Sequence, residues 1–151
     1  MGAHTVMLTS SANKVEDAQK LGADDVVLTS VSDDLEKHAG SFDLIINTIS
    51  GEHDADSFLP LLAREGTMSF VGAPQTPLPI MIGNLLMGDK AIAGSLIGGI
   101  PSTAEMLQFC ADHGITADIE MINMDQVNEA WDRIENNDVK YRFVIDLASL
   151  S

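Results

Sequence analysis

Two hydroxyls and a lysine follow the first apolar segment of the chain. Ser10 and Ser11 lie at the end of the segment 4–11, and Lys14 comes shortly after them. Hydroxyl donors beside an ammonium group suit the oxygens of a phosphate monoester. The alternative is that a serine caps the helix expected at 13–22, with Lys14 solvated on its surface. The residues alone leave both interpretations open.

Other candidate residues lie at the ends of later apolar segments, and one arginine lies near the end of the chain. Arg142 carries a planar, permanently charged fork that suits an anionic ligand, and a surface ion pair with Asp146 or Glu135 would suit it equally well. The remaining candidates are also what ordinary strand ends with turn glycines would contain. They are Thr48, Ile49, Val71, Gly72, Ala73, Ser95, Leu96 and Ile97.

No residue pattern typical of a metal site or a nucleophilic centre is present. Cys110 is the single cysteine, and the four histidines do not show the HExxH spacing. His53 lies between Glu52 and Asp54, but adjacent residues rarely converge on one ion. We therefore expect all four histidines to be structural, and no catalytic residue or metal ligand set within this chain.

The composition excludes several classes of partner. The 151 residues include 8 Lys+Arg and 23 Asp+Glu, a formal net charge of −15 at pH 7. Nucleic acids and anionic membranes both attract basic surfaces, so neither is an expected partner. No apolar run has the length of a transmembrane helix, and the opening residues lack the layout of a secretory signal. We expect a cytoplasmic protein with a reduced thiol.

Apolar segments alternate with amphipathic segments along the chain, which is typical of an α/β fold. Strands are expected at 4–11, 23–30, 42–50, 67–74, 91–100, 117–122 and 141–148. Helices are expected at 13–22, 33–40, 55–65, 82–89, 101–113 and 124–138, with Pro60 able to kink or delay the third. Because helices separate such apolar strands, the strands should run parallel in a sheet covered on both faces.

This pattern lacks the usual opening of a dinucleotide-binding domain. Such a domain begins with a strand, a GxGxxG turn and a helix whose N-terminus holds the pyrophosphate. Here the chain opens at what would be the second strand, and neither Gly2 nor Gly98–Gly99 has that context. The expected fold class is α/β, an incomplete Rossmann-type doubly wound parallel sheet that lacks its first strand and glycine-rich loop.

Five segments carry a resemblance to a known family. In order they are LGADDVVLTS, SFDLIINTIS, LLAREGTMSFVGAP, IAGSLIGGI and DVKYRFVIDL. Together they resemble the C-terminal half of a zinc-dependent medium-chain alcohol dehydrogenase, in particular the cinnamyl-alcohol-dehydrogenase-like, NADP-dependent aldehyde reductases. The resemblance implies a single truncated nucleotide-binding domain, 1–151, whose residues 117–151 include segments that would join an absent catalytic domain.

The resemblance also assigns the candidate residues to one cofactor, NADP. The hydroxyls and the ammonium after the first strand would hold its 2′-phosphate, where NAD-preferring relatives carry an acidic residue. The residues at the other strand ends would contact the nicotinamide, and the arginine would bind the pyrophosphate. The residues so assigned are Thr9, Ser10, Ser11, Lys14, Thr48, Ile49, Val71, Gly72, Ala73, Ser95, Leu96, Ile97 and Arg142.

The implied function is hydride transfer between the nicotinamide and an alcohol or aldehyde. In this family the zinc ligands and catalytic residues lie in a domain that these residues do not include, so the chain alone is expected to be inactive. The alternative is a non-catalytic nucleotide-binding or oligomeric structural module. Open sheet edges beside a missing strand, together with the apolar segment 91–100, predict a homodimer joined by strand pairing.

Overall fold

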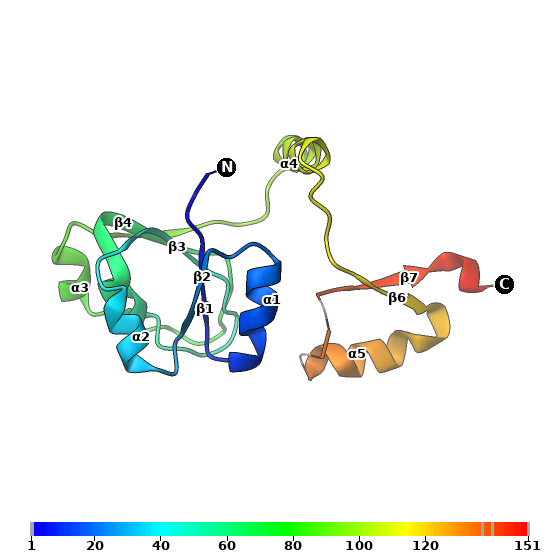
Figure 1. Cartoon of the computed structure of the whole chain (residues 1–151), viewed down its shortest axis with the longest axis horizontal. Helices are drawn as coiled ribbons and strands as arrows, with labels where there is room; N and C mark the ends of the chain where they lie inside the picture. The colour runs from blue at the N-terminus through cyan, green and yellow to red at the C-terminus, as the bar shows by residue number, and fades with distance from the viewer. Residues whose placement is uncertain (1, 137, 140, 151) are drawn as a thin grey trace. The chain divides into compact units, whose positions relative to one another are not determined.

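The computed structural model describes residues 2–136, 138–139 and 141–150, with only the backbone at Ser32. The chain divides into two compact units, residues 1–96 and 97–151 (Figure 1). The strands and α-helices of the first unit are β1 Val6–Thr9, α1 Val15–Lys20, β2 Asp25–Leu28, α2 Ser32–Lys37, β3 Phe42–Asn47, β4 Leu62–Phe70, α3 Ile82–Leu86 and β5 Ala91–Gly94. Those of the second unit are α4 Ile100–Asp112, β6 Glu120–Asn123, α5 Val127–Glu135 and β7 Phe143–Asp146.

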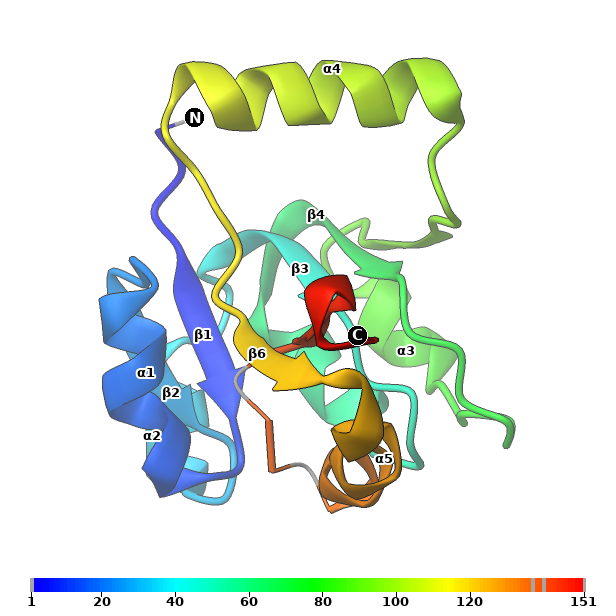
Figure 2. The same cartoon turned by 90° about the vertical axis from the view of Figure 1, so that its right-hand side faces the viewer.

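Every strand pair in the described residues is parallel, which confirms the α/β fold class with parallel sheets. In the first unit β1 pairs with β2, and β3, β4 and β5 pair in that order. Ile45 of β3 lies opposite Met68 of β4, which lies opposite Ile92 of β5. Among the described residues no ladder joins β1 to β3, so the sheet is interrupted at that point. Figure 2 shows β1 and β3 from the side, with α1 alongside β1 and β2.

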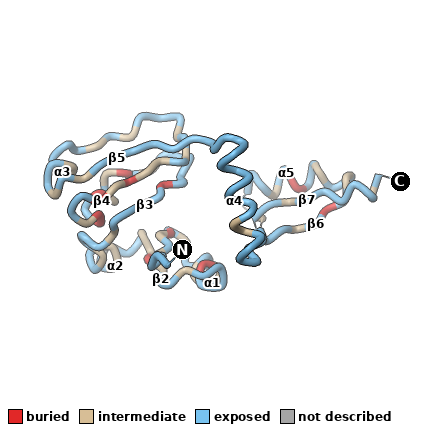
Figure 3. Tube along the Cα trace, turned by 90° about the horizontal axis from the view of Figure 1, so that it is seen from above, coloured by how far each residue is buried: buried red, intermediate tan, exposed pale blue. Residues whose placement is uncertain are grey.

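The core of the first unit lies around β3 and β4. Leu59, Leu62 and Met68 are fully buried, and Ile45 and Leu61 complete the buried cluster. Buried positions gather on these strands and on the turn before β4 in Figure 3. Burial of these apolar side chains stabilises β3 and β4, and with them the segments that follow the ends of the two strands.

The prediction of a helix at 55–65 is wrong. A short 3₁₀ helix covers Asp56–Leu61, and β4 begins at the next residue. Pro60 has no N–H to donate, so it cannot support a continuing α-helix. Gly66 lies inside β4, where a Cβ would stand 2.9 Å from a backbone oxygen of β3. The close approach of β3 and β4 therefore requires glycine at this position.

The fifth strand is shorter than the predicted 91–100. β5 ends at Gly94, opposite Phe70, the last residue of β4. The N–H of Ser95 donates to the Phe70 carbonyl at 2.9 Å. Beyond this bond β4 offers no further partner, and a strand without a partner loses its hydrogen bonds. Residues 95–97 consequently follow the strand instead of forming its last residues.

One arginine of α5 contacts both strands of the second unit, β6 and β7. Arg133 donates to the Glu120 carboxylate at 2.8 Å and to the Asp138 carboxylate at 3.0 Å, and it lies over the Phe143 ring. The hydrogen bond to Glu120 and then the bond to Asp138 raise the pKa of Arg133. No helix among the described residues combines the length and the apolar character needed to span a membrane.

Candidate cofactor site

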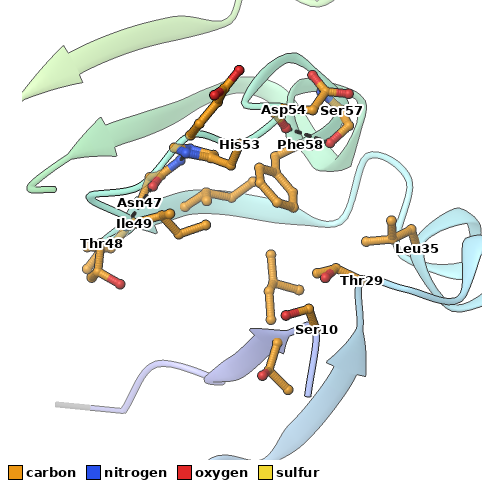
Figure 4. Close-up of a pocket in the computed structure, with 15 residues that line it drawn as sticks. Ser10, Thr29, Leu35, Asn47, Thr48, Ile49, His53, Asp54, Ser57 and Phe58 are labelled. Atoms are coloured by element: carbon orange, nitrogen blue, oxygen red, sulfur yellow. Dashed lines mark hydrogen bonds between the residues drawn. The ribbon is translucent and has the colours of Figure 1, made fainter. Parts of the chain in front are cut away.

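A cavity of about 480 Å³ opens between β1 and β3 where both strands end. Ser10 comes to it from the end of β1, and Thr48 and Ile49 come from the end of β3 (Figure 4). Leu8 and Phe58 are among its apolar lining residues. Ligands of wound α/β sheets bind outside the carboxyl ends of the strands. The interruption of the sheet thus coincides with the edge at which such ligands bind.

Asn47 connects the ends of β3 and β4. Its side chain is only 4% exposed, and its Oδ1 accepts the N–H of Ile49 at 3.0 Å. Its main-chain oxygen accepts the N–H groups of Val71 at 2.9 Å and Gly72 at 3.2 Å. One buried residue therefore holds together two segments, 48–49 and 71–72, that were predicted separately as nicotinamide contacts.

The turn after β1 carries the predicted phosphate-binding residues. The N–H of Ser11 donates to Oγ1 of the buried Thr9 at 3.2 Å, and Ser10 is exposed at the cavity. Ser11 occupies the N-cap position of the following 3₁₀ helix, Ala12–Lys14, but its side chain makes no capping hydrogen bond. The Lys14 side chain is exposed and forms no ion pair with the residues that the structure describes. Two hydroxyls and one ammonium are thus free to meet a ligand.

The remaining predicted residues lie further away along the chain. Ser95 stands at the end of β5, and the side chains of Leu96 and Ile97 are almost fully exposed. Arg142 is exposed too, and among the described residues its guanidinium pairs with neither of the partners expected from the sequence. Ile97 and Arg142 belong to the second unit, whereas the other candidate residues belong to the first. Ala73 is exposed, directly after Gly72.

Sequence reasoning missed Asn47 and His53 as residues of this site. Asn47 was not singled out, and His53 was expected to be structural only. In the structure both line the cavity, and their side chains are 2.9 Å apart. The one available signal was an apolar strand that ends on an amide and is followed by Gly-x-His at 51–53. Local patterns of this kind do not reveal which polar groups meet.

Comparison with known proteins decides the family. The family model described as zinc-binding dehydrogenase matches residues 1–112. The chain belongs to the zinc-binding dehydrogenase family. The resemblance seen in the five sequence segments is thereby confirmed.

Individual proteins similar to this zinc-binding dehydrogenase chain support the same family assignment. It is 55% identical to "Aldehyde reductase YahK" of Escherichia coli (strain K12), over all of the chain and 44% of that protein. It is 45% identical to "NADP-dependent alcohol dehydrogenase C 1" of Mycolicibacterium smegmatis, over 99% of the chain and 43% of that protein. The solved structure of a cinnamyl alcohol dehydrogenase from Sorghum bicolor superposes with a TM-score of 0.89 and 41% identity, over 95% of the chain and 41% of that structure. The chain spans less than half the length of the curated relatives it matches.

The name of the zinc-binding dehydrogenase family raises the question of a metal site. A catalytic zinc takes three protein ligands, commonly His, Cys, Asp or Glu. Nowhere in the described residues do three such side chains gather in a way that could hold a metal ion. The described residues therefore do not fit a zinc ion.

Proposed function

We propose that this chain is the cofactor-binding part of an NADP-dependent alcohol dehydrogenase or aldehyde reductase. The observation that carries the proposal is the cavity at the carboxyl ends of β1 and β3. Free hydroxyls and an unpaired ammonium lie after β1, and the linked backbone segments 48–49 and 71–72 lie after β3 and β4. The printed names of two relatives, an aldehyde reductase and an NADP-dependent alcohol dehydrogenase, support the same function.

Each part of the site would take a different part of the dinucleotide. Ser10, Ser11 and Lys14 would bind the 2′-phosphate through charge-assisted hydrogen bonds. Thr9 would hold the Ser11 backbone in place, since its Oγ1 accepts the Ser11 N–H. Residues proposed to contact the nicotinamide or the pyrophosphate are Thr48, Ile49, Val71, Gly72, Ala73, Ser95, Leu96, Ile97 and Arg142.

The chemistry of the proposed reaction comes from the cofactor. When bound, the nicotinamide donates or accepts a hydride. The residues of this chain bind and orient the cofactor, and no metal ligand set is found among those that the structure describes. We propose that residues 117–151 include segments that join the catalytic domain of the enzyme, and that the enzyme is cytoplasmic and binds no nucleic acid.

Nucleotide titration of the purified chain tests this function. We expect NADPH to bind more tightly than NADH, and Lys14→Ala to weaken NADPH binding about tenfold while leaving NADH unchanged, because a hydrogen bond to a charged group contributes about 1.5–3 kcal/mol. Lys20→Ala is the matched control, since this lysine of α1 is paired with Glu16 at 2.7 Å. Equal affinity for both nucleotides, or equal effects of both substitutions, would contradict the assignment.

We also propose that the chain forms a homodimer through strand pairing. The Thr9 carbonyl accepts from Thr29, just after β2, and the Asn47 carbonyl accepts from the segment after β4. Because backbone groups alternate sides along a strand, those of Leu8 and Ile46 point away from these partners. No ladder pairs that side of β1 or β3 among the described residues, and β5 is paired only with β4. Open edges of this kind favour pairing with another chain.

Light scattering coupled to size-exclusion chromatography tests the dimer. We expect a mass near twice the 16.1 kDa of one chain. A mass near 16 kDa at every concentration would contradict the proposal. The measurement is repeated at high salt, where screening weakens the repulsion between two chains of net charge −15. Charge repulsion then no longer masks association by strand pairing.

A further inference from the structure

His53 makes two hydrogen bonds at the edge of the cavity. Its Nε2 lies 2.9 Å from Nδ2 of Asn47, and its Nδ1 lies 2.9 Å from the carbonyl oxygen of Gly51. The ring lies close to Asn47 in Figure 4, and the side chain is half-buried. The nearby Phe58 ring packs at a tilt, with the ring centroids 6.5 Å apart. His53 is therefore held from three sides.

The hydrogen bonds determine the protonation state of the ring. The N–H of Ile49 donates to Asn47, so the acceptor at that position is Oδ1 and the amide Nδ2 faces the histidine. Nδ2 donates, and Nε2 must therefore accept. A carbonyl oxygen only accepts, so Nδ1 carries the proton that is shared with Gly51. All three bonds exist together only in the neutral Nδ1–H form of His53.

The same bonds connect the histidine to the strand ends. Removing the imidazole would leave the Nδ2 protons of the buried Asn47 without this acceptor. A buried donor without a partner is unfavourable, so the amide would turn to find another. Any such turn would take Oδ1 away from the N–H of Ile49. The Asn47 main chain, which accepts from Val71 and Gly72, would lose part of its support.

We propose that His53 is a positioning residue of the cofactor site. In its neutral Nδ1–H form it fixes the Asn47 side chain, and through Asn47 it fixes the backbone of 48–49 beside that of 71–72. The nicotinamide end of the dinucleotide then meets a preformed surface. This inference rests on the proposed function for its ligand, but the hydrogen-bond chain itself exists without a ligand.

Three variants of the chain test this proposal. His53→Phe keeps a ring and removes both hydrogen bonds. His53→Gln restores an acceptor, its Oε1, for the Asn47 amide. His38→Phe is the matched control, because this histidine also packs against a phenylalanine, Phe42, but does not line the cavity.

Two quantities are measured on each variant, the affinity for each nucleotide and the hydrogen-exchange rate of the Ile49 amide. We expect His53→Phe to weaken the binding of NADPH and of NADH by the same factor, about tenfold, because both nucleotides carry the nicotinamide. We also expect the backbone amide of Ile49 to exchange its hydrogen faster. His53→Gln should recover most of both effects, and His38→Phe should show neither. If the two histidine-to-phenylalanine variants behave alike, or glutamine fails to rescue, His53 has no positioning role.

A spectroscopic measurement on the unaltered chain keeps the test independent of folding. The ¹⁵N shifts of the His53 ring should report a proton on Nδ1 and a bare Nε2. A proton on Nε2 would overturn the proposal. If the unaltered chain binds neither nucleotide, the proposed function fails, while the ring shifts and the Ile49 exchange rate still decide whether His53 positions the strand ends.

Discussion

Gly72 lies directly against the main chain of Ile49. An ideal Cβ at position 72 would stand 2.4 Å from the Ile49 carbonyl oxygen and 2.6 Å from its carbonyl carbon. Both contacts are with backbone, which cannot move aside as the end of a side chain can. The ends of β3 and β4 can therefore approach this closely only when residue 72 has no side chain.

This contact predicts the effect of Gly72→Ala. The added methyl group must separate the two strand ends, and overpacking of this kind lowers the free energy of unfolding by about 1–3 kcal/mol. Affinity for NADPH and NADH should fall together, since the separated segments are the proposed nicotinamide contacts. Urea unfolding and nucleotide titration measure the two effects.

Gly83→Ala is the control for that substitution. Gly83 lies in α3 with no atom within 4 Å of an added Cβ, and alanine favours a helix over glycine. We expect this variant to be as stable as the original chain or slightly more so. A similar loss of stability in both variants would show that the contact with Ile49 is not the cause.

Ser10→Asp should change the cofactor preference. A carboxylate at the end of β1 would repel a 2′-phosphate and could accept hydrogen bonds from the free hydroxyls of an NADH ribose. We expect the ratio of NADPH to NADH affinity to fall below one. Ser102→Asp, on the exposed surface of α4, should leave that ratio unaltered. An unchanged ratio for Ser10→Asp would show that this turn does not contact the 2′-phosphate.

The chain by itself should hold no stoichiometric zinc and reduce no aldehyde. The described residues lack three gathered ligands, and a catalytic zinc needs three. Elemental analysis of the purified chain and an assay of NADPH-dependent cinnamaldehyde reduction measure both points. One zinc per chain, or turnover of cinnamaldehyde, would contradict the expectation.

Leu59→Ala tests the core that supports the cavity. Leu59 is fully buried before β4, and replacing a buried leucine by alanine costs about 2–5 kcal/mol of unfolding free energy. Leu86→Ala in α3, where the side chain is 74% exposed, should change it by less than about 0.5 kcal/mol. Far-UV circular dichroism in urea is the suitable measurement, because Trp131, the single tryptophan, lies in the second unit. Equal midpoints would contradict the assigned core.

The sequence predicted much of the fold because the relevant signals are local. Alternating apolar and amphipathic segments indicate parallel strands separated by helices, and each predicted strand overlaps an observed one. The exception, 55–65, shows where local patterns fail. Phe58, Leu61 and Leu62 have helical spacing, but Pro60 prevents the helix and pairing with β3 extends the chain from Leu62. Strand pairing with a distant segment is invisible in a short window.

For the site, the sequence by itself determined which residue types stand at the strand ends, including the hydroxyls and lysine after β1. Only the tertiary structure decided which of them meet. Asn47 links β3 to the segment after β4, and His53 completes that link from a loop. The partners of a buried amide depend on how separate segments pack, because a buried polar group takes whichever donor or acceptor the fold brings within about 3 Å of it.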